Sequence, residues 1–437
     1  MTSQSRAFVA HTTRTLLLGL IGLGCLKASA TAAADTAAGR ELFLHEWRPG
    51  DGRSHDGDGL GPLYNDTSCI ACHNLGGAGG GGAANKNVEI LMRSKESGLL
   101  HLFGTRPDYD RWRLLAAGED FALKVSEENA TSGEDPSEWE MRRRVLLMQV
   151  SLPRPLSRIS VRARITRRNP TSLFGAGLID DIPESVIEAA AKDNTSSEVR
   201  GRVSRLANGR IGRFGWKGQT ESLRQFVRQA CAAELGLEVP GHSQAADPTQ
   251  PTVKVKGLDL DEVECESLTA FVSSLKRPIE RVPQDTEEGL AIQKGKEAFA
   301  AIGCAACHRP ALGNVEGIYS DLLLHNLGRD LLDGGQYSIL SQPPKPSAPA
   351  VVGKQPEVLG QRTRAGGLAT PMEWRTPPLW GLQASAPYMH DGRAKTIEDA
   401  IAVHGGEATS SAKYFFKLAP DQRQDVITFL KTLTVGD

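Results

Sequence analysis

The sequence has almost no net charge, no long apolar run and no long strand pattern. Acidic and basic residues nearly balance, with a formal net charge of -1, which argues against a nucleic-acid partner recruited by bulk charge. The main apolar run, residues 15–26, is too short to span a bilayer comfortably. Alternating apolar and polar residues never continue far enough to predict a large sheet. Helical patterns are common instead, so we expect a mainly α-helical protein.

The N-terminus indicates an export signal. Arg6 and Arg14 lie at or before the start of the apolar run, and small residues between 28 and 34 offer cleavage sites. This order is typical of a secretory signal peptide, which we expect at residues 1–34. A membrane anchor and a lipid attached at Cys25 are the alternatives. We therefore predict a periplasmic or secreted protein with no stable membrane span after signal cleavage.

Two five-residue motifs carry the chemistry of the mature chain. Residues 69–73 read C-I-A-C-H, and residues 304–308 read C-A-A-C-H. In C-x-x-C-H, two thiols form thioethers with the vinyl groups of one porphyrin, and the adjacent histidine becomes the proximal ligand of the iron. A zinc site built from C-x-x-C pairs would not need these histidines. We therefore expect two covalently bound c-type haems, held by Cys69, Cys72, His73, Cys304, Cys307 and His308.

Two cysteines of the mature chain are left over, Cys231 and Cys265. An even pair in an oxidising compartment favours a disulfide, which we predict. Closing that loop would stabilise the fold by roughly 4 kcal/mol on the chain-entropy model. The alternative is two buried free thiols.

Three patterns occur twice along the chain. They are a short helical pattern before each motif, a loop containing proline, and a longer helical pattern that closes each half. The copies lie at residues 38–43 and 293–299, at 168–175 and 375–381, and at 268–275 and 426–433.

These copies resemble parts of a cytochrome c domain and indicate a duplication. The length of 437 residues suits two or three domains. We predict one cytochrome c-like domain at residues 35–282, enlarged by insertions, and a second at 286–437. Residues 276–285 contain two prolines and form the expected linker.

Several segments together resemble the bacterial di-haem oxidoreductase family, whose members are also described as peroxidases or thiol oxidoreductases. That family is related to di-haem cytochrome c peroxidases and to the methylamine-utilisation di-haem enzyme. Besides the haem motifs, the matching segments are residues 59–65, 213–217, 375–381, 388–394 and 400–408.

The resemblance implies two unequal haems. In the peroxidase relatives the C-terminal haem is six-coordinate and passes electrons, and its second ligand follows the His-Asp-Gly block. Here His404 holds that place, so we predict ligation by His308 and His404, with Met372 and Met389 as rivals. Two histidines give a lower potential than a histidine and a methionine. A simple hydrogen-bonding role for His404 is the alternative.

The first haem, with His73 as proximal ligand, is then the one that faces substrate. Peroxide reduction there needs an open distal face and a group that moves a proton between the two oxygens, and the sequence does not reveal that group. The candidates are Glu119, Glu127, Glu128 and His101, whereas His45 or His55 could instead close the distal face. For His325 and His390 we expect a structural or haem-propionate role.

We therefore expect a peroxidase-type di-haem oxidoreductase. Electrons from a small redox protein or cytochrome would enter at haem 2, and peroxide or a similar oxidant would be reduced at haem 1. The alternatives are an electron-transfer cytochrome without peroxidase activity and an enzyme that oxidises a protein or metal substrate. Among the relatives a calcium ion lies between the domains, so calcium is a further cofactor to consider.

Overall fold

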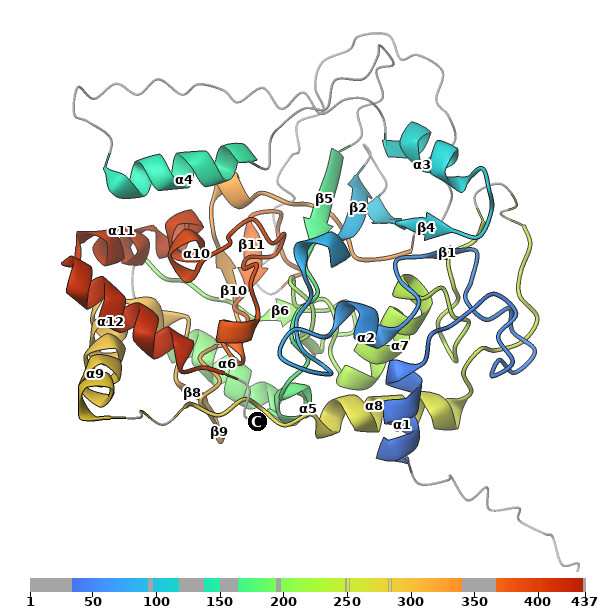
Figure 1. Cartoon of the computed structure of the whole chain (residues 1–437), viewed down its shortest axis with the longest axis horizontal. Helices are drawn as coiled ribbons and strands as arrows, with labels where there is room; N and C mark the ends of the chain where they lie inside the picture. The colour runs from blue at the N-terminus through green and yellow to red at the C-terminus, as the bar shows by residue number, and fades with distance from the viewer. Residues whose placement is uncertain are drawn as a thin grey trace, which may run out of the picture. The chain divides into compact units, whose positions relative to one another are not determined.

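Two helix pairs organise the chain in the computed structural model (Figure 1). Helix α1 (Thr36–Leu44) packs against α8 (Glu262–Ser274), and α9 (Thr286–Ala301) packs against α12 (Pro420–Lys431). The predicted first and closing helical patterns are therefore confirmed as helices. The structure describes residues 34–92, 97–117, 137–149, 164–193, 198–247, 250, 252–281, 283, 285–339 and 367–434.

Within each pair, the two helices approach each other closely at a glycine. A Cβ atom on Gly39 of α1 would lie 1.9 Å from the carbonyl oxygen of Ser267, and one on Gly295 of α9 would lie 2.1 Å from that of Asp425. Only glycine permits helix backbones to approach so closely.

Aromatic rings reinforce both crossings. The rings of Phe43 and Phe271 lie 5.2 Å apart, and those of Phe299 and Phe429 lie 5.5 Å apart. The repeat inferred from the sequence thus extends to the packing of both helix pairs.

Local caps explain where these helices begin. The Asp35 carboxylate accepts a hydrogen bond from the Ala37 amide at the start of α1, and Asp285 does the same for Glu288 in α9. Asp261 and Glu264 form a reciprocal capping box at the start of α8. Each carboxylate satisfies an amide that has no partner inside its helix.

The other helices are shorter. Ser222 is the N-cap of α7, and its side chain accepts a hydrogen bond from the Gln225 amide. Their bounds are α2 (Cys69–Cys72), α3 (Tyr109–Ala117), α4 (Glu138–Gln149), α5 (Ala176–Asp180), α6 (Glu184–Asp193), α7 (Leu223–Glu234), α10 (Ile397–Val403) and α11 (Thr409–Lys417). Short 3-10 turns lie at Ala84–Lys86, Cys304–Ala306, Arg329–Leu331, Leu382–Ala384 and Gly406–Ala408.

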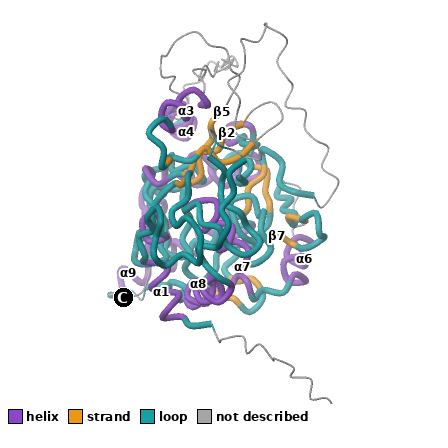
Figure 2. The backbone as a smooth tube through the Cα atoms, turned by 90° about the vertical axis from the view of Figure 1, so that its right-hand side faces the viewer, coloured by secondary structure: helices purple, strands orange, loops and turns teal. Residues whose placement is uncertain are grey.

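Strands are few and short in the described chain (Figure 2). The largest sheet is antiparallel, with β2 (Val88–Met92) between β3 (Ser97–Leu100) and β5 (Arg164–Arg168). The remaining strands form two-stranded ladders: β1 (Leu63–Tyr64) with β4 (Phe103–Gly104), β6 (Ser204–Arg205) with β7 (Ile211–Gly212), β8 (Ala311–Leu312) with β9 (Val315–Glu316), and β10 (Leu324–Asn326) with β11 (Glu373–Arg375). The expectation of a mainly helical protein without a large sheet is confirmed over these residues.

The predicted disulfide is wrong. Cys231 of α7 and Cys265 of α8 are free thiols with 2% and 0% exposure, inside the large apolar core that also contains Phe43 and Phe271. A buried thiol packs as a small apolar side chain. Both sulfurs are therefore used for packing rather than for a covalent link.

Two predictions on chain organisation are not decided by this structure. Residues 34–437 form one compact unit, so the division into domains at 35–282 and 286–437 stays a prediction. Nearly all of the expected signal peptide at 1–34, including Cys25, lies outside the described residues. Among the helices that the structure does describe, none has the length and apolar character needed to cross a membrane.

Candidate haem sites

The three predicted iron-ligating histidines share one local arrangement. In each, Nδ1 lies within hydrogen-bonding distance of a backbone carbonyl oxygen, which fixes the ring and leaves Nε2 as the ligand atom. The distances are 3.1 Å from His73 to Gly80, 3.0 Å from His308 to Tyr319 and 2.6 Å from His404 to Ala400. Burial lowers the pKa of all three rings, that of His308 to about 4, so each is neutral and able to bind metal.

His308 and His404 face each other. Their ring centroids lie 6.4 Å apart. Two imidazole nitrogens that share one metal ion at ~2 Å each are about 4 Å apart, and their ring centroids are then about 2 Å further apart. The separation of the two rings therefore fits one iron ion held between them.

Local structure places His404. It is the C-cap of α10, directly after Val403, and a capping box between Thr396 and Asp399 begins this helix. The rival ligand Met389 instead packs its side chain against the cluster of Trp139, Leu146, Ala402, Val403 and Ala412. Compared with Met389, His404 has the geometry that suits the second ligand of haem 2.

The four motif cysteines share one protonation state. Burial raises the pKa of Cys69 and of Cys304 to about 12 and also raises that of Cys72 and Cys307, so they are thiols rather than thiolates. All four, like the three ligand histidines, are only partly buried, as we expect of side chains that contact a haem.

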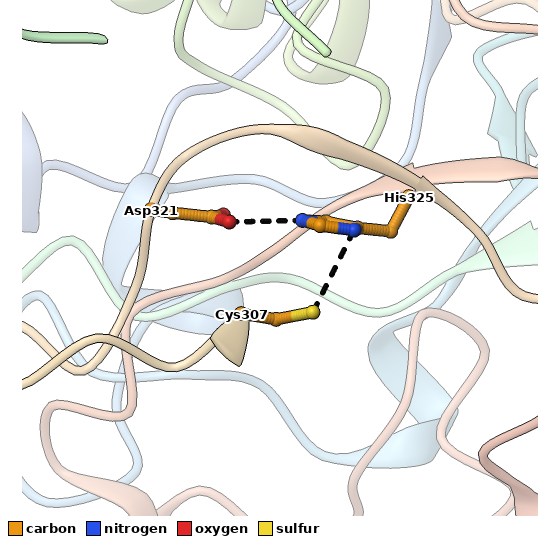
Figure 3. A group of neighbouring side chains, drawn as sticks. All are labelled: Cys307, Asp321 and His325. Carbon is orange, nitrogen blue, oxygen red and sulfur yellow. Dashed lines mark hydrogen bonds and ion pairs between the residues drawn. The ribbon is translucent and has the colours of Figure 1, made fainter. Parts of the chain in front are cut away.

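A charged cluster adjoins the second motif (Figure 3). His325 lies 2.9 Å from Asp321 through Nε2 and 2.9 Å from Glu407 through Nδ1, and the Cys307 sulfur is 3.6 Å from Nδ1. Burial opposes a charged ring, but the hydrogen bonds to Asp321, Cys307 and Glu407 outweigh it and raise the pKa of His325 to about 12. An imidazolium cannot bind metal, which argues against iron ligation by His325, and its structural or haem-propionate role stays a prediction.

The histidines proposed near haem 1 have other partners. Nε2 of His101 is 2.9 Å from the Ala233 carbonyl, and burial lowers the pKa of this ring to about 4. His45 pairs with Asp51 at 2.9 Å, and the exposed His55 pairs with Glu264 at 2.7 Å. Within the described chain, His73 therefore has no imidazole partner comparable to His404. Glu119, Glu127 and Glu128 lie outside the described residues.

The sequence did not indicate one acidic group that lies beside haem 1. Glu234, the last residue of α7, accepts hydrogen bonds from the Tyr337 hydroxyl and, at 2.6 Å, from the Asn65 side chain. Burial raises the pKa of Glu234. The three residues come from distant segments, and the only hint in the sequence is that Asn65 lies just before the first haem motif.

His390 joins the two halves of the chain. It stacks on Trp374 with ring centroids 3.7 Å apart, and its carbonyl oxygen accepts a hydrogen bond of 2.6 Å from the Asn169 amide. Asn169 also donates from its side chain to Gly82, nine residues after His73, and accepts from the Trp216 indole at 2.9 Å. His390 and Asn169 thus join Trp374, in the second half of the chain, to the segment that follows the first haem motif.

Trp380 has a packing role. Its ring is 4% exposed in the large core, where a Cβ atom on Gly175 would lie 2.3 Å from it. The two proline-containing loops of the repeat therefore contact each other.

Comparisons with known proteins agree with these motifs. Residues 359–433 match the family model described as "Di-haem oxidoreductase, putative peroxidase". Cytochrome c551 peroxidase of Pseudomonas aeruginosa is 24% identical over 291 residues, which are 62% of this chain and 74% of that protein. Methylamine utilization protein MauG of Methylorubrum extorquens is 23% identical over 247 residues, which are 50% of this chain and 60% of MauG.

Among solved structures, a MauG-like protein associated with microbial copper homeostasis matches at 17% identity, with a TM-score of 0.29, over 59% of this chain and 90% of that one. The names of the relatives, together with the two C-x-x-C-H motifs, indicate c-type haem and an oxidoreductase. The resemblance predicted from the sequence is confirmed, and the chain is related to di-haem oxidoreductases of the cytochrome c peroxidase and MauG type.

Proposed function

We propose that this chain is a periplasmic di-haem c-type oxidoreductase of the peroxidase type. Haem 2, held by Cys304, Cys307, His308 and His404, receives electrons from a small redox protein or cytochrome. Haem 1, held by Cys69, Cys72 and His73, is the site where peroxide or a similar oxidant is reduced.

The unequal surroundings of the two proximal histidines carry this proposal. His308 faces His404 at a separation that suits ligation on both sides of one iron. His73 has no such partner in the described chain, where His45 and His55 are paired with carboxylates. A six-coordinate iron suits electron transfer, whereas binding of an oxidant requires an open position.

The protein supplies attachment, orientation and insulation. When bound, the haems supply electron transfer and the activation of the oxidant. The backbone carbonyls of Gly80, Tyr319 and Ala400 set the orientation of the three ligand rings. The hydrogen bonds of Asn169 to His390 and to Gly82 hold the segment after the first motif against the second half of the chain. The calcium ion implied by the resemblance stays a prediction.

Spectroscopy of the holoprotein tests the proposal. We expect one low-spin and one high-spin ferric haem in the EPR spectrum, and turnover of peroxide with a reduced cytochrome as donor. His404→Ala should convert the low-spin signal into a high-spin one, whereas the exposed His55→Ala should leave both signals unchanged. Two low-spin haems that do not respond to peroxide would instead identify an electron-transfer cytochrome.

A further inference from the structure

The hydroxyl of Tyr337 is hydrogen-bonded to a carboxylate, which distinguishes it from those of Tyr109 and Tyr388. Its hydroxyl donates to Oε1 of Glu234, while Oε2 of Glu234 accepts from Nδ2 of Asn65 at 2.6 Å. Tyr109 and Tyr388, by contrast, donate to backbone carbonyls at 2.8 and 3.0 Å. A carbonyl satisfies a phenol but cannot take its proton, whereas a carboxylate can do both.

The pair lies beside the first haem motif. The amide of Asn65 donates to the Glu234 carbonyl at 2.7 Å, and the carboxylate of the next residue, Asp66, is 3.5 Å from the Cys72 sulfur. The charge of Glu234 contributes to the raised pKa of Cys72, and Cys72 in turn contributes to that of Tyr337. Asn65 and Asp66 are adjacent in the chain, so the hydrogen bonds of Asn65 to Glu234 and the contact of Asp66 with Cys72 bring the phenol and its acceptor near the attachment point of haem 1.

The surroundings favour transfer of a proton together with an electron. Burial, together with the nearby Glu234 charge, raises the pKa of Tyr337 well above its ordinary value, so the phenol does not release its proton to water. Burial also makes the Glu234 carboxylate a stronger base than an exposed glutamate. Oxidation of the phenol would make it strongly acidic, and the nearest base is already hydrogen-bonded to it.

We propose that Tyr337 is a redox-active residue that serves haem 1, with Glu234 as the acceptor of its proton. The proposal rests on the proposed function, in which peroxide is the oxidant and removes two electrons. Tyr337 returns one of these electrons to haem 1, and its O–H bond breaks as the proton moves to Oε1 of Glu234. A neutral phenoxyl radical and a neutral carboxylic acid remain. One electron from the donor, delivered through haem 2, and the return of the same proton restore both side chains. A second donor electron replaces the other electron that peroxide removed, and two protons from solvent complete the reduction of peroxide to water.

Freeze-quench EPR of the holoprotein mixed with peroxide tests this assignment. We expect a tyrosyl radical that narrows when the protein is made with ring-deuterated tyrosine. Tyr337→Phe should remove the signal, whereas the matched variant Tyr109→Phe, which loses a buried hydroxyl bonded only to a carbonyl, should keep it. Glu234→Gln retains the shape of the side chain but cannot accept the proton, so radical formation should slow by about a hundredfold.

Haem content and thermal unfolding show whether each variant is folded. If Tyr337→Phe does not hold both haems, difluorotyrosine incorporated at position 337 replaces it, and its altered EPR spectrum should identify the radical site. A signal that Tyr337→Phe retains, or that lacks the fluorine splitting, would overturn the proposal.

Two outcomes separate this proposal from the proposed function. Peroxide that oxidises haem 1 without any tyrosyl radical contradicts the role of Tyr337 and leaves the peroxidase function standing. Peroxide that does not react with either haem contradicts the peroxidase function. In that case a ruthenium photo-oxidant replaces peroxide. The role of Tyr337 is overturned if no tyrosyl radical appears, or if the radical also appears in Tyr337→Phe.

Discussion

At the scale of single residues, sulfur has two separate uses in this chain. Four cysteines lie in the haem motifs, and Cys231 and Cys265 fill the apolar core as free thiols. An even number of spare cysteines favours a disulfide only if their geometry permits one. Cysteine counting cannot supply that geometry, which is why the predicted disulfide was wrong.

Thiol titration checks this use of sulfur. In the unfolded holoprotein we expect Cys231 and Cys265 both to react, and a reductant should leave the melting temperature unchanged. Cys265→Ala should lower the free energy of unfolding by about 1–2 kcal/mol because it removes a fully buried atom. Absence of reactive thiols in the unfolded protein, together with a lower melting temperature in reductant, would restore the disulfide.

Lys217 is a second residue whose surroundings change its chemistry. Its ammonium donates to the carbonyls of Thr370, Pro371 and Glu373 and lies 3.6 Å from the centre of the Trp374 ring. Burial, assisted by the nearby Arg168 charge, lowers the pKa of Lys217 from 10.5 to about 7. Lys217 is therefore partly neutral at physiological pH.

This shift predicts a specific dependence of stability on pH. Between about pH 7 and 10.5 the unfolded chain holds a proton at Lys217 that the folded protein has lost. Because the unfolded state then binds more protons, the contribution of Lys217 to the free energy of unfolding rises with pH over this range. Measured by urea unfolding, the free energy of unfolding should rise less between pH 7 and pH 9.5 in Lys217→Met than in the wild type. The exposed Lys254→Met is the control, and an equal rise in all three proteins would contradict the shift.

At the scale of elements, two glycines set how closely the paired helices approach. A Cβ atom at Gly39 or Gly295 would collide with a backbone carbonyl of the partner helix, which cannot rotate away as a side chain can. Gly39→Ala and Gly295→Ala should each lower the free energy of unfolding by about 3 kcal/mol.

A third glycine provides the control for this prediction. Gly289 also lies in α9, but its nearest outside contact to a Cβ atom is 3.4 Å away. Gly289→Ala should therefore raise the free energy of unfolding, by up to about 1 kcal/mol, through its better helix propensity. If chemical denaturation gives the same change in the free energy of unfolding for all three glycine variants, the close helix contacts at Gly39 and Gly295 do not determine stability.

The elements also show which features a sequence can reveal. The helices of both pairs were predictable because their apolar spacing is local, and the haem motifs because five adjacent residues carry the chemistry. Nearly a hundred residues separate His308 from His404, so the prediction that both ligate one haem came only from the resemblance. The contact of Tyr337 with Glu234 joins residues 103 positions apart, and neither residue lies in a pattern that would indicate the other.

At the scale of the whole molecule, the two motifs should be separable. Pyridine haemochrome analysis of the wild type should give two haems per chain. We expect one haem in the double variant Cys69→Ala/Cys72→Ala and one in Cys304→Ala/Cys307→Ala. The low-spin EPR signal should survive in the first variant and disappear in the second, because His308 and His404 hold the same iron. Survival in the second variant would assign that signal to haem 1 and contradict the proposed order of the haems.

The spacing of the helix pairs along the chain has a consequence for how the protein folds. A much longer stretch of chain separates α1 from α8 than α9 from α12. Closing the longer loop costs more conformational entropy, and contacts between distant residues form more slowly. The half that the ribosome makes last should therefore fold first. In pulsed hydrogen exchange during refolding, amides of α9 and α12 should become protected before those of α1 and α8.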